Sequence, residues 1–118
     1  MSYDLDLIDP VTKKTIELDF PHAMRGGTYA LGGTTQASLN VTYNYARFFY
    51  KTMGDDGIRT LYGKTGAESI PILQSAIGQL GDDVSDNYWD DTEGNAKQAL
   101  CQLLALAKMR PDGVWSGD

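Results

Sequence analysis

Two short stretches near the N-terminus alternate apolar and polar side chains. In residues 3–7 and 16–20 every second side chain is apolar, and the side chains between them are acidic. A period of two is typical of strands with one buried face. Asp9 and Pro10 favour a turn between them, because proline presets φ and aspartate can bond its own backbone. We therefore expect a β-hairpin, after which residues 21–33, with two glycine pairs, add a third short strand or form a loop.

The pattern changes period in the next segment, over residues 35–53. One face of a helix drawn through this segment is mostly apolar and carries Leu39, Thr42, Tyr43, Ala46, Phe49, Tyr50 and Met53. The opposite face is polar and carries Asn40, Asn44, Arg47 and Lys51. This division predicts an amphipathic first helix. Gly54 follows the last apolar residue, where a left-handed residue commonly ends a helix.

A capping signature introduces a second helix. Thr65 and Glu68 have the spacing at which the hydroxyl accepts from the third amide and the carboxylate accepts from the first. Ser69 is an alternative cap, because a helix that began at Gly66 would lose a backbone hydrogen bond at Pro71. The sequence leaves both starts open.

A third helix is predicted after the acidic connection of residues 81–91. Thr92 opens it and Glu93 stands in the first turn, where the helix dipole favours an acid. Pro111 ends it. We expect Trp115, in the tail beyond, to return to the body of the protein, because an unanchored indole would leave a large ring in water.

These elements predict a single α+β domain over residues 1–118. We expect an N-terminal antiparallel β-hairpin of two or three strands packed against three helices. The residues expected to hold the core are Leu39, Phe49, Ile77, Leu100, Leu103 and Leu104.

Composition and charge narrow the classes of function. Apolar residues make up 42% of the 118 residues, which is ordinary for a globular domain. Sixteen acidic and ten basic residues give a net charge of -6, so attraction to phosphate backbones is missing and wrapping of nucleic acid is not expected. We see neither a signal peptide nor an apolar run long enough for a membrane span, and we expect a cytoplasmic protein without membrane contact.

Two motifs resemble ligand-binding sequences but fail in their spacing. Gly63-Lys64-Thr65 looks like the end of a phosphate-binding P-loop, yet five residues rather than four separate Gly57 from Gly63. The aspartates of residues 82–91 lack the glycine and the glutamate that a calcium-binding EF-hand loop needs. A solvated acidic connection is the simpler interpretation.

His22 and Cys101 are the single histidine and the single cysteine. No positional signature joins His22 to a serine and an aspartate, so we expect a loop histidine without a catalytic role. Cys101 stands beside the apolar face of the third helix and is expected to be a half-buried thiol without special chemistry. We expect no cofactor and no metal site within one chain, whereas a zinc site shared in an oligomer stays open.

The strongest candidate binding site combines the glycine pairs with the start of the first helix. Its residues are Arg25, Gly26, Gly27, Thr28, Tyr29, Thr34, Thr35, Tyr43, Asn44 and Arg47. Glycines permit close backbone approach, hydroxyls and a helix N-terminus donate to anions, and Arg25 can form two hydrogen bonds to a phosphate. Tyr43, Asn44 and Arg47 could add stacking and base-edge contacts. The alternative is that the glycines only form tight turns and the tyrosines fill the core.

Four segments, spread over nearly the whole chain, carry a resemblance to known sequences. They are residues 25–29 (RGGTY), 39–45 (LNVTYNY), 62–71 (YGKTGAESIP) and 109–115 (MRPDGVW). Through them the chain resembles a group of small proteins encoded in phages and prophages of gut Firmicutes. The resemblance implies a phage accessory protein made inside a bacterial host, and it supplies no functional residues.

Three functions remain as hypotheses. The first is a non-enzymatic phage accessory protein that binds a small phosphorylated metabolite of the host, such as a nucleotide signal of antiviral defence, and so acts in counter-defence. The second is an acidic inhibitor whose residues 82–91 imitate phosphate spacing toward a basic surface of a host protein. The third is an enzyme that works through Asp and Glu residues from distant positions. Each is compatible with a homo-oligomer.

Overall fold

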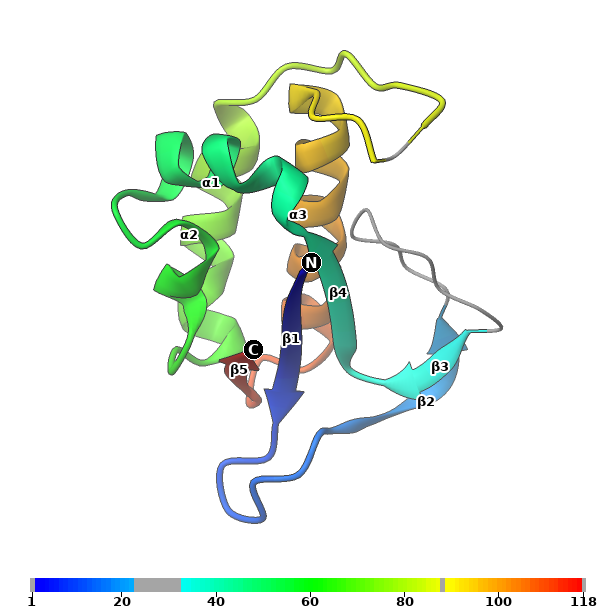
Figure 1. Cartoon of the computed structure of the whole chain (residues 1–118). Coiled ribbons are helices and arrows are strands. Elements are labelled where there is room, and N and C mark those ends of the chain that lie inside the picture. The colour runs from blue at the N-terminus through cyan, green and yellow to red at the C-terminus, as the bar shows by residue number, and fades with distance from the viewer. Residues whose placement is uncertain (1, 23–32, 88, 118) are drawn as a thin grey trace.

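The fold is a three-stranded antiparallel sheet packed against helices, with a separate two-stranded sheet at its side (Figure 1). The computed structural model describes residues 2–22, 33–87 and 89–117. Among these residues the strands are β1 (Ser2–Ile8), β2 (Glu17–His22), β3 (Thr34–Gln36), β4 (Ser38–Thr42) and β5 (Val114–Gly117). The helices are α1 (Ala46–Met53), α2 (Gly66–Gly78) and α3 (Glu93–Met109), with short 3₁₀ helices η1 (Tyr43–Tyr45) and η2 (Gly57–Leu61). The predicted α+β class is confirmed.

The larger sheet has β1 at its centre, between β4 and β5. Tyr3, Leu5 and Leu7 of β1 are buried, whereas Asp4 between them is exposed. In Figure 1 α3 passes behind β1 and β4, and α2 packs against α3. The period of two that predicted a strand with one buried face is therefore confirmed for β1.

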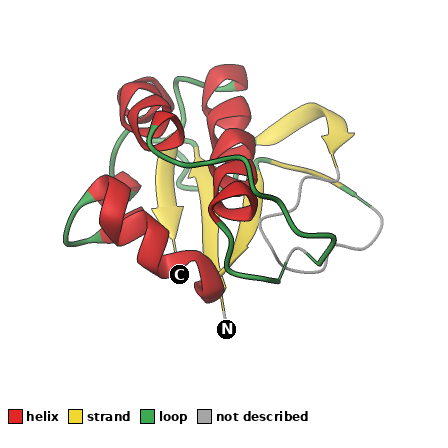
Figure 2. Cartoon of the chain, turned by 90° about the horizontal axis from the view of Figure 1, so that it is seen from above, coloured by secondary structure: helices red, strands yellow, loops and turns green. Residues whose placement is uncertain are grey.

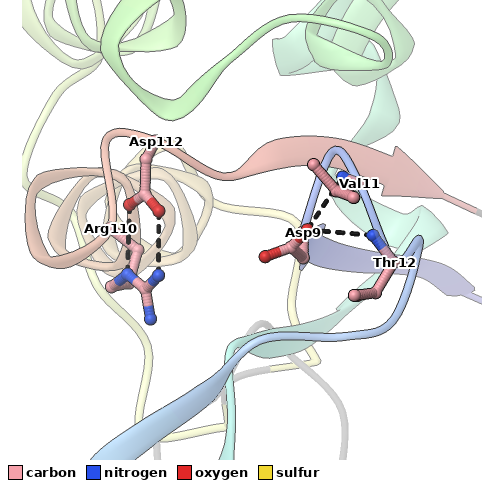
Figure 3. A network of polar contacts seen from close by, with 5 residues as sticks. All are labelled: Asp9, Val11, Thr12, Arg110 and Asp112. Carbon is pink, nitrogen blue, oxygen red and sulfur yellow. Dashed lines mark hydrogen bonds and ion pairs between the residues drawn. The ribbon is translucent and has the colours of Figure 1, made fainter.

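The turn between β1 and β2 forms as predicted, but the two strands separate after it. The Asp9 carboxylate accepts from two backbone N–H groups of the turn, at 2.8 and 3.0 Å (Figure 3). Ala37 then lies between the strands, because its N–H donates to the Ile16 carbonyl and its carbonyl accepts from the Leu7 N–H. Beyond this point β1 pairs with β4 and β5, and β2 pairs with β3. The hairpin pairing that we expected is thus confined to the turn and the residues next to it, where Ile8 bridges Thr15 and the Ile16 N–H donates to the Leu7 carbonyl at 2.9 Å.

The predicted first helix is wrong in its first half. Ala37, Leu39 and Val41 are buried and alternate with less buried residues, so residues 38–42 form β4 instead. A helical pattern puts Leu39 and Thr42 on one face and leaves Val41 off it, and a short apolar segment of this kind fits either period. The second half is confirmed as α1, which ends before Gly54 with a positive φ of 93°.

The starts of α2 and α3 follow the predicted caps. The Thr65 hydroxyl accepts from the Glu68 N–H at 3.0 Å, and the Glu68 carboxylate accepts from the Thr65 N–H at 2.9 Å. The bond from the Thr65 N–H to the carboxylate lowers the pKa of Glu68. Ser69 lies inside α2 and is buried, so the alternative start at Ser69 is wrong. In α3, Thr92 is the N-cap, as expected.

The expected core is largely confirmed. Leu39, Phe49, Leu100 and Leu103 are buried, and Ile77 and Leu104 are partly buried against the same cluster. The tail does return to the body: it forms β5 beside β1, and Trp115 is 1% exposed.

Asp6, on the outer face of the larger sheet, should make the stability of the protein depend on pH. Its partial burial, and next the charge of Asp4 on the same strand, raise the pKa of Asp6. Because folding raises this pKa, the folded protein binds the proton more tightly than the unfolded chain, and stability falls as the pH rises through this range. We therefore expect Asp6→Asn to stabilise the protein at neutral pH, by less than about 1 kcal/mol since the group is partly exposed. Urea midpoints measured from pH 3 to 7 should show this gain shrinking toward low pH; a gain that is constant with pH would contradict the assignment.

Candidate functional site

The structure separates the residues of the glycine-rich candidate site. Those that lie outside the described residues are Arg25, Gly26, Gly27, Thr28 and Tyr29. Thr34 and Thr35 lie on β3, where the Thr35 hydroxyl donates to the Glu17 carboxylate at 3.1 Å. Because the chain continues from there as β4, no helix begins at Thr35 to offer N–H groups to an anion, and that part of the prediction is wrong.

Tyr43 belongs to the edge of the core. The centroid of its ring lies 4.5 Å from that of Tyr3 in an edge-to-face arrangement, and the ring packs against the buried cluster. This is the alternative that the sequence left open for the tyrosines, in which they contribute to packing.

Asn44 and Arg47 contact a different segment, residues 81–91, which we name the acidic loop. The Asn44 side chain donates to the Trp89 carbonyl at 2.8 Å. The Arg47 guanidinium donates to the Asp91 carbonyl at 3.2 Å and pairs with the Asp91 carboxylate at 3.1 Å. Two of the predicted site residues therefore attach the acidic loop to η1 and α1.

Asn95 of α3 also binds the acidic loop, and this residue is buried, with 2% of its surface exposed. Its side-chain oxygen accepts from the Ser85 N–H at 3.2 Å. Its side-chain nitrogen donates to the carbonyls of Asn87 at 3.1 Å and Asp90 at 3.0 Å. A single buried amide thus fixes three points of the loop backbone, and its donor and acceptor are both used.

Further bonds order the acidic loop internally and tie it to the start of α3. The Ser85 hydroxyl donates to the Asp90 carboxylate at 2.6 Å. Lys97 pairs with Asp82 at 2.7 Å, and this bond raises the pKa of Lys97. The Asp83 carboxylate accepts from the Gly94 N–H at 3.2 Å, at the helix end where the dipole favours negative charge. The aspartates of the loop are exposed, as expected for a solvated connection, and these bonds tie its described residues to one another and to α3.

The outer surface of the acidic loop combines negative charge with apolar side chains. Val84 is 55% exposed and Trp89 is 40% exposed. The aspartates of the loop are all exposed, and they are Asp82, Asp83, Asp86, Asp90 and Asp91. Large apolar side chains exposed beside a rim of charge are typical of surfaces that contact another macromolecule.

A pocket of about 320 Å³ lies where the loop meets α1. Arg47 and Lys51 line it on the α1 side, and Asp83, Asp91 and Glu93 line it from the loop and the start of α3. Arg47 also lies over the Phe48 ring, with its guanidinium carbon 4.3 Å from the ring centroid. The charged groups of the pocket comprise two cations and three carboxylates, so it offers no excess of positive charge to a phosphate.

The reactive side chains do not gather at this loop. His22 is the last residue of β2 rather than a loop histidine, and its Nε2 lies 2.7 Å from the Gln36 carbonyl. Cys101 lies on α3 and is exposed, which corrects the expected half-buried thiol. Within residues 2–22, 33–87 and 89–117, no three His, Cys, Asp or Glu side chains lie close enough together to hold a metal ion.

The sequence pointed to Arg47 and Asn44 but missed the residue on which the loop depends. Asn95 follows the Thr92 cap by three residues, and nothing in that spacing shows that its side chain turns toward residues 85–90. Its one local signal is an amide placed among the apolar positions of α3. Such a residue needs buried hydrogen-bond partners.

Comparison with known proteins leaves the site to be interpreted from its own geometry. No protein-family model matches the chain, and neither a curated protein nor a solved structure matches it. In the described part of the chain, no helix combines the length and the apolar character needed to cross a bilayer.

Proposed function

We propose that this protein is a non-enzymatic binding protein whose acidic loop docks on a basic surface of another protein. The observation that carries the proposal is the buried Asn95 amide, which fixes the loop backbone while Val84, Trp89 and the aspartates face outward. A loop ordered before binding loses less conformational entropy when it binds. Aromatic anchors beside charged groups are the residues that most often dominate binding energy.

The chemistry of the partner follows from the charge of the loop. The loop has five exposed aspartates within ten residues, and two of them, Asp82 and Asp91, already pair with Lys97 and Arg47. The net negative charge that remains attracts Lys and Arg side chains and repels phosphate. From the resemblance to phage-encoded proteins, we propose further that the partner is a protein of the bacterial host. The acidic loop would then compete with the nucleic acid or phosphorylated ligand of that protein.

Binding of a phosphorylated metabolite is the second candidate. Arg47 and Lys51 line one pocket, and Arg47 belongs to the binding site that the sequence predicted. Its guanidinium is already paired with Asp91, so a phosphate would have to displace a carboxylate of the same chain. We therefore place this function second.

Charge reversal at Asp86 tests the proposed function. Asp86 is exposed, and no hydrogen bond or salt bridge ties it to another described residue, so Asp86→Lys should leave the fold intact. The tagged protein would be incubated with a lysate of a gut Firmicutes bacterium and the retained proteins quantified by mass spectrometry. We expect a basic protein to be retained, with at least a tenfold loss for Asp86→Lys and a loss for the wild type at high salt.

The matched control for this experiment is Asp55→Lys, which makes the same charge change at an exposed residue between α1 and η2. It should retain the partner at the wild-type level. Equal retention by both variants would contradict the proposal. Native mass spectra of the purified protein separate the second candidate, because a bound metabolite adds a defined mass that Arg47→Ala removes.

A further inference from the structure

A second surface, away from the acidic loop, lies between β2 and the end of α3. A pocket of about 230 Å³ is lined there by Glu17, Leu18, Asp19, Phe20, Met109 and Arg110. Phe20 is 79% exposed and Met109 is 48% exposed. Two large apolar side chains thus stand in water on the same pocket, which is the kind of patch that marks an interaction site.

The charges around this pocket favour a cation. Glu17 and Asp19 contribute two carboxylates, and the C-terminal end of α3 carries the negative end of the helix dipole. Arg110 is neutralised by Asp112, since its Nε and terminal nitrogen donate to the two carboxylate oxygens at 3.1 and 2.8 Å (Figure 3). The pocket therefore presents apolar walls and net negative charge.

The strand that borders this pocket, β2, lies at the edge of its sheet. Within the part of the chain that the structure describes, β2 and β3 form a sheet of two strands only, so each strand has a partner on one side. Figure 2 shows this sheet at the side of the molecule, away from α1 and α2. An edge strand presents backbone N–H and C=O groups that another extended segment can pair with.

We propose that this surface binds an extended segment of a partner protein that carries a Lys or Arg side chain. The segment adds a strand to β2. The aliphatic stem of its basic side chain lies on Phe20 and Met109, and the cationic end reaches Glu17 and Asp19, because long basic side chains bury their stems while the charge stays near water and acids. This inference does not depend on the function of the acidic loop.

The charges argue against a second copy of the chain as the occupant. If two β2 strands paired edge to edge, the Glu17 and Asp19 carboxylates of each copy would face an equally acidic strand. Like charges across a strand pair are destabilising. The net charge of -6 adds to this repulsion.

A display library of random eight-residue peptides tests the proposal. The intact wild-type protein would be the bait, with Phe20→Ser as the bait for subtraction. We expect enriched peptides to contain Lys or Arg next to apolar residues. The most enriched peptide, synthesised and followed by fluorescence anisotropy, should bind at least tenfold more weakly to Asp19→Lys.

Two variants serve as controls for this binding. Val11→Ser removes another exposed apolar side chain outside the pocket, and Asp86→Lys changes the acidic loop, so both should bind the peptide as the wild type does. Peptides without basic residues, unchanged binding to Asp19→Lys, or no enrichment at all would overturn the proposal. Sedimentation showing self-association that Phe20→Ser abolishes would also overturn it, because the occupant would then be a second copy. If Phe20→Ser fails to fold, Asp19→Lys remains a surface change that decides the question.

Discussion

Replacing Trp115 by alanine should lower the free energy of unfolding by about 3 to 5 kcal/mol. The indole is 1% exposed, and β5, on which it lies, pairs with the central strand β1. Its backbone also bonds both sides of the turn before α2, through the Gly63 N–H and the Lys64 carbonyl. Since the free energy of unfolding of such domains is about 5 to 15 kcal/mol in total, this loss is a large share of the stability. Chemical denaturation followed by circular dichroism measures it.

The polar end of Trp115 allows a sharper version of this test if the alanine variant fails to fold. The indole N–H donates to the Ser69 hydroxyl at 2.8 Å, and that hydroxyl donates to the Gly66 carbonyl at 2.7 Å. Ser69→Ala leaves the buried N–H without a partner, which should cost about 1 to 3 kcal/mol. In a Trp115→Phe background no N–H is left unpaired, so Ser69→Ala should cost less there. Purely additive effects would show that the bond contributes nothing.

The return of the C-terminal tail and the starts of α2 and α3 could be predicted from the sequence. A tail with a large indole beyond a helix stop has to find apolar surface, so the return of residues 114–117 to the core could be expected. The caps at Thr65 and Thr92 were visible because capping depends on residues only three apart. Features of this kind can be predicted because they depend on residues that are close together in the sequence.

The strand pairing could not be predicted in the same way. Ala37, between β3 and β4, bonds to both Ile16 and Leu7, so one continuous stretch of chain serves two sheets. A hairpin is the default for two alternating stretches joined by a turn, and nothing in either stretch shows that a third segment separates them. The wrong prediction of a helix over residues 35–42 has the same origin. Residues 38–42 form a strand because they pair with β1, and their own pattern does not show this pairing.

The candidate site was predicted in part for the same physical reason. Arg47 and Asn44 stood out as polar groups on a helix face, and both do make long-range contacts. Their partners are carbonyls and a carboxylate of the acidic loop, about 45 residues further along the chain. Side-chain chemistry shows that a group needs a partner, whereas only the fold shows which partner it has.

Asn95→Asp should be more damaging than Asn95→Ala, although it changes the shape of the side chain less. In the wild type the amide nitrogen donates to two carbonyls, of Asn87 and Asp90. Alanine leaves those groups unpaired near the surface, and we expect a loss of about 1 to 3 kcal/mol. Aspartate instead points a charged oxygen at two carbonyl oxygens in a buried position, so the loss should be larger. Denaturation at neutral pH ranks the two variants.

The pH dependence of the aspartate variant follows from the same contact. The protonated acid can donate one hydrogen bond, so the folded state should raise the pKa of this introduced carboxyl above its ordinary value. The variant should then regain stability as the pH falls, whereas Asn95→Ala should keep a constant deficit relative to the wild type. Parallel loss of stability by both variants at every pH would contradict the role of the amide as a donor to the loop.

Gly94→Ala tests the position of the loop without touching its hydrogen-bonding side chains. A Cβ at Gly94 would lie 2.6 Å from the Val84 nitrogen and 2.7 Å from the Asp83 carbonyl carbon, so the loop backbone has to move. We expect weaker binding of the protein partner and faster hydrogen exchange at the Ser85 amide, with the exchange of α2 unchanged. Gly78→Ala is the matched control, because its Cβ would meet nothing within 4 Å and alanine favours the helix by about 0.5 to 1 kcal/mol. If Gly94→Ala binds the partner as well as Gly78→Ala does, then the fixed geometry of the acidic loop is not what the partner recognises.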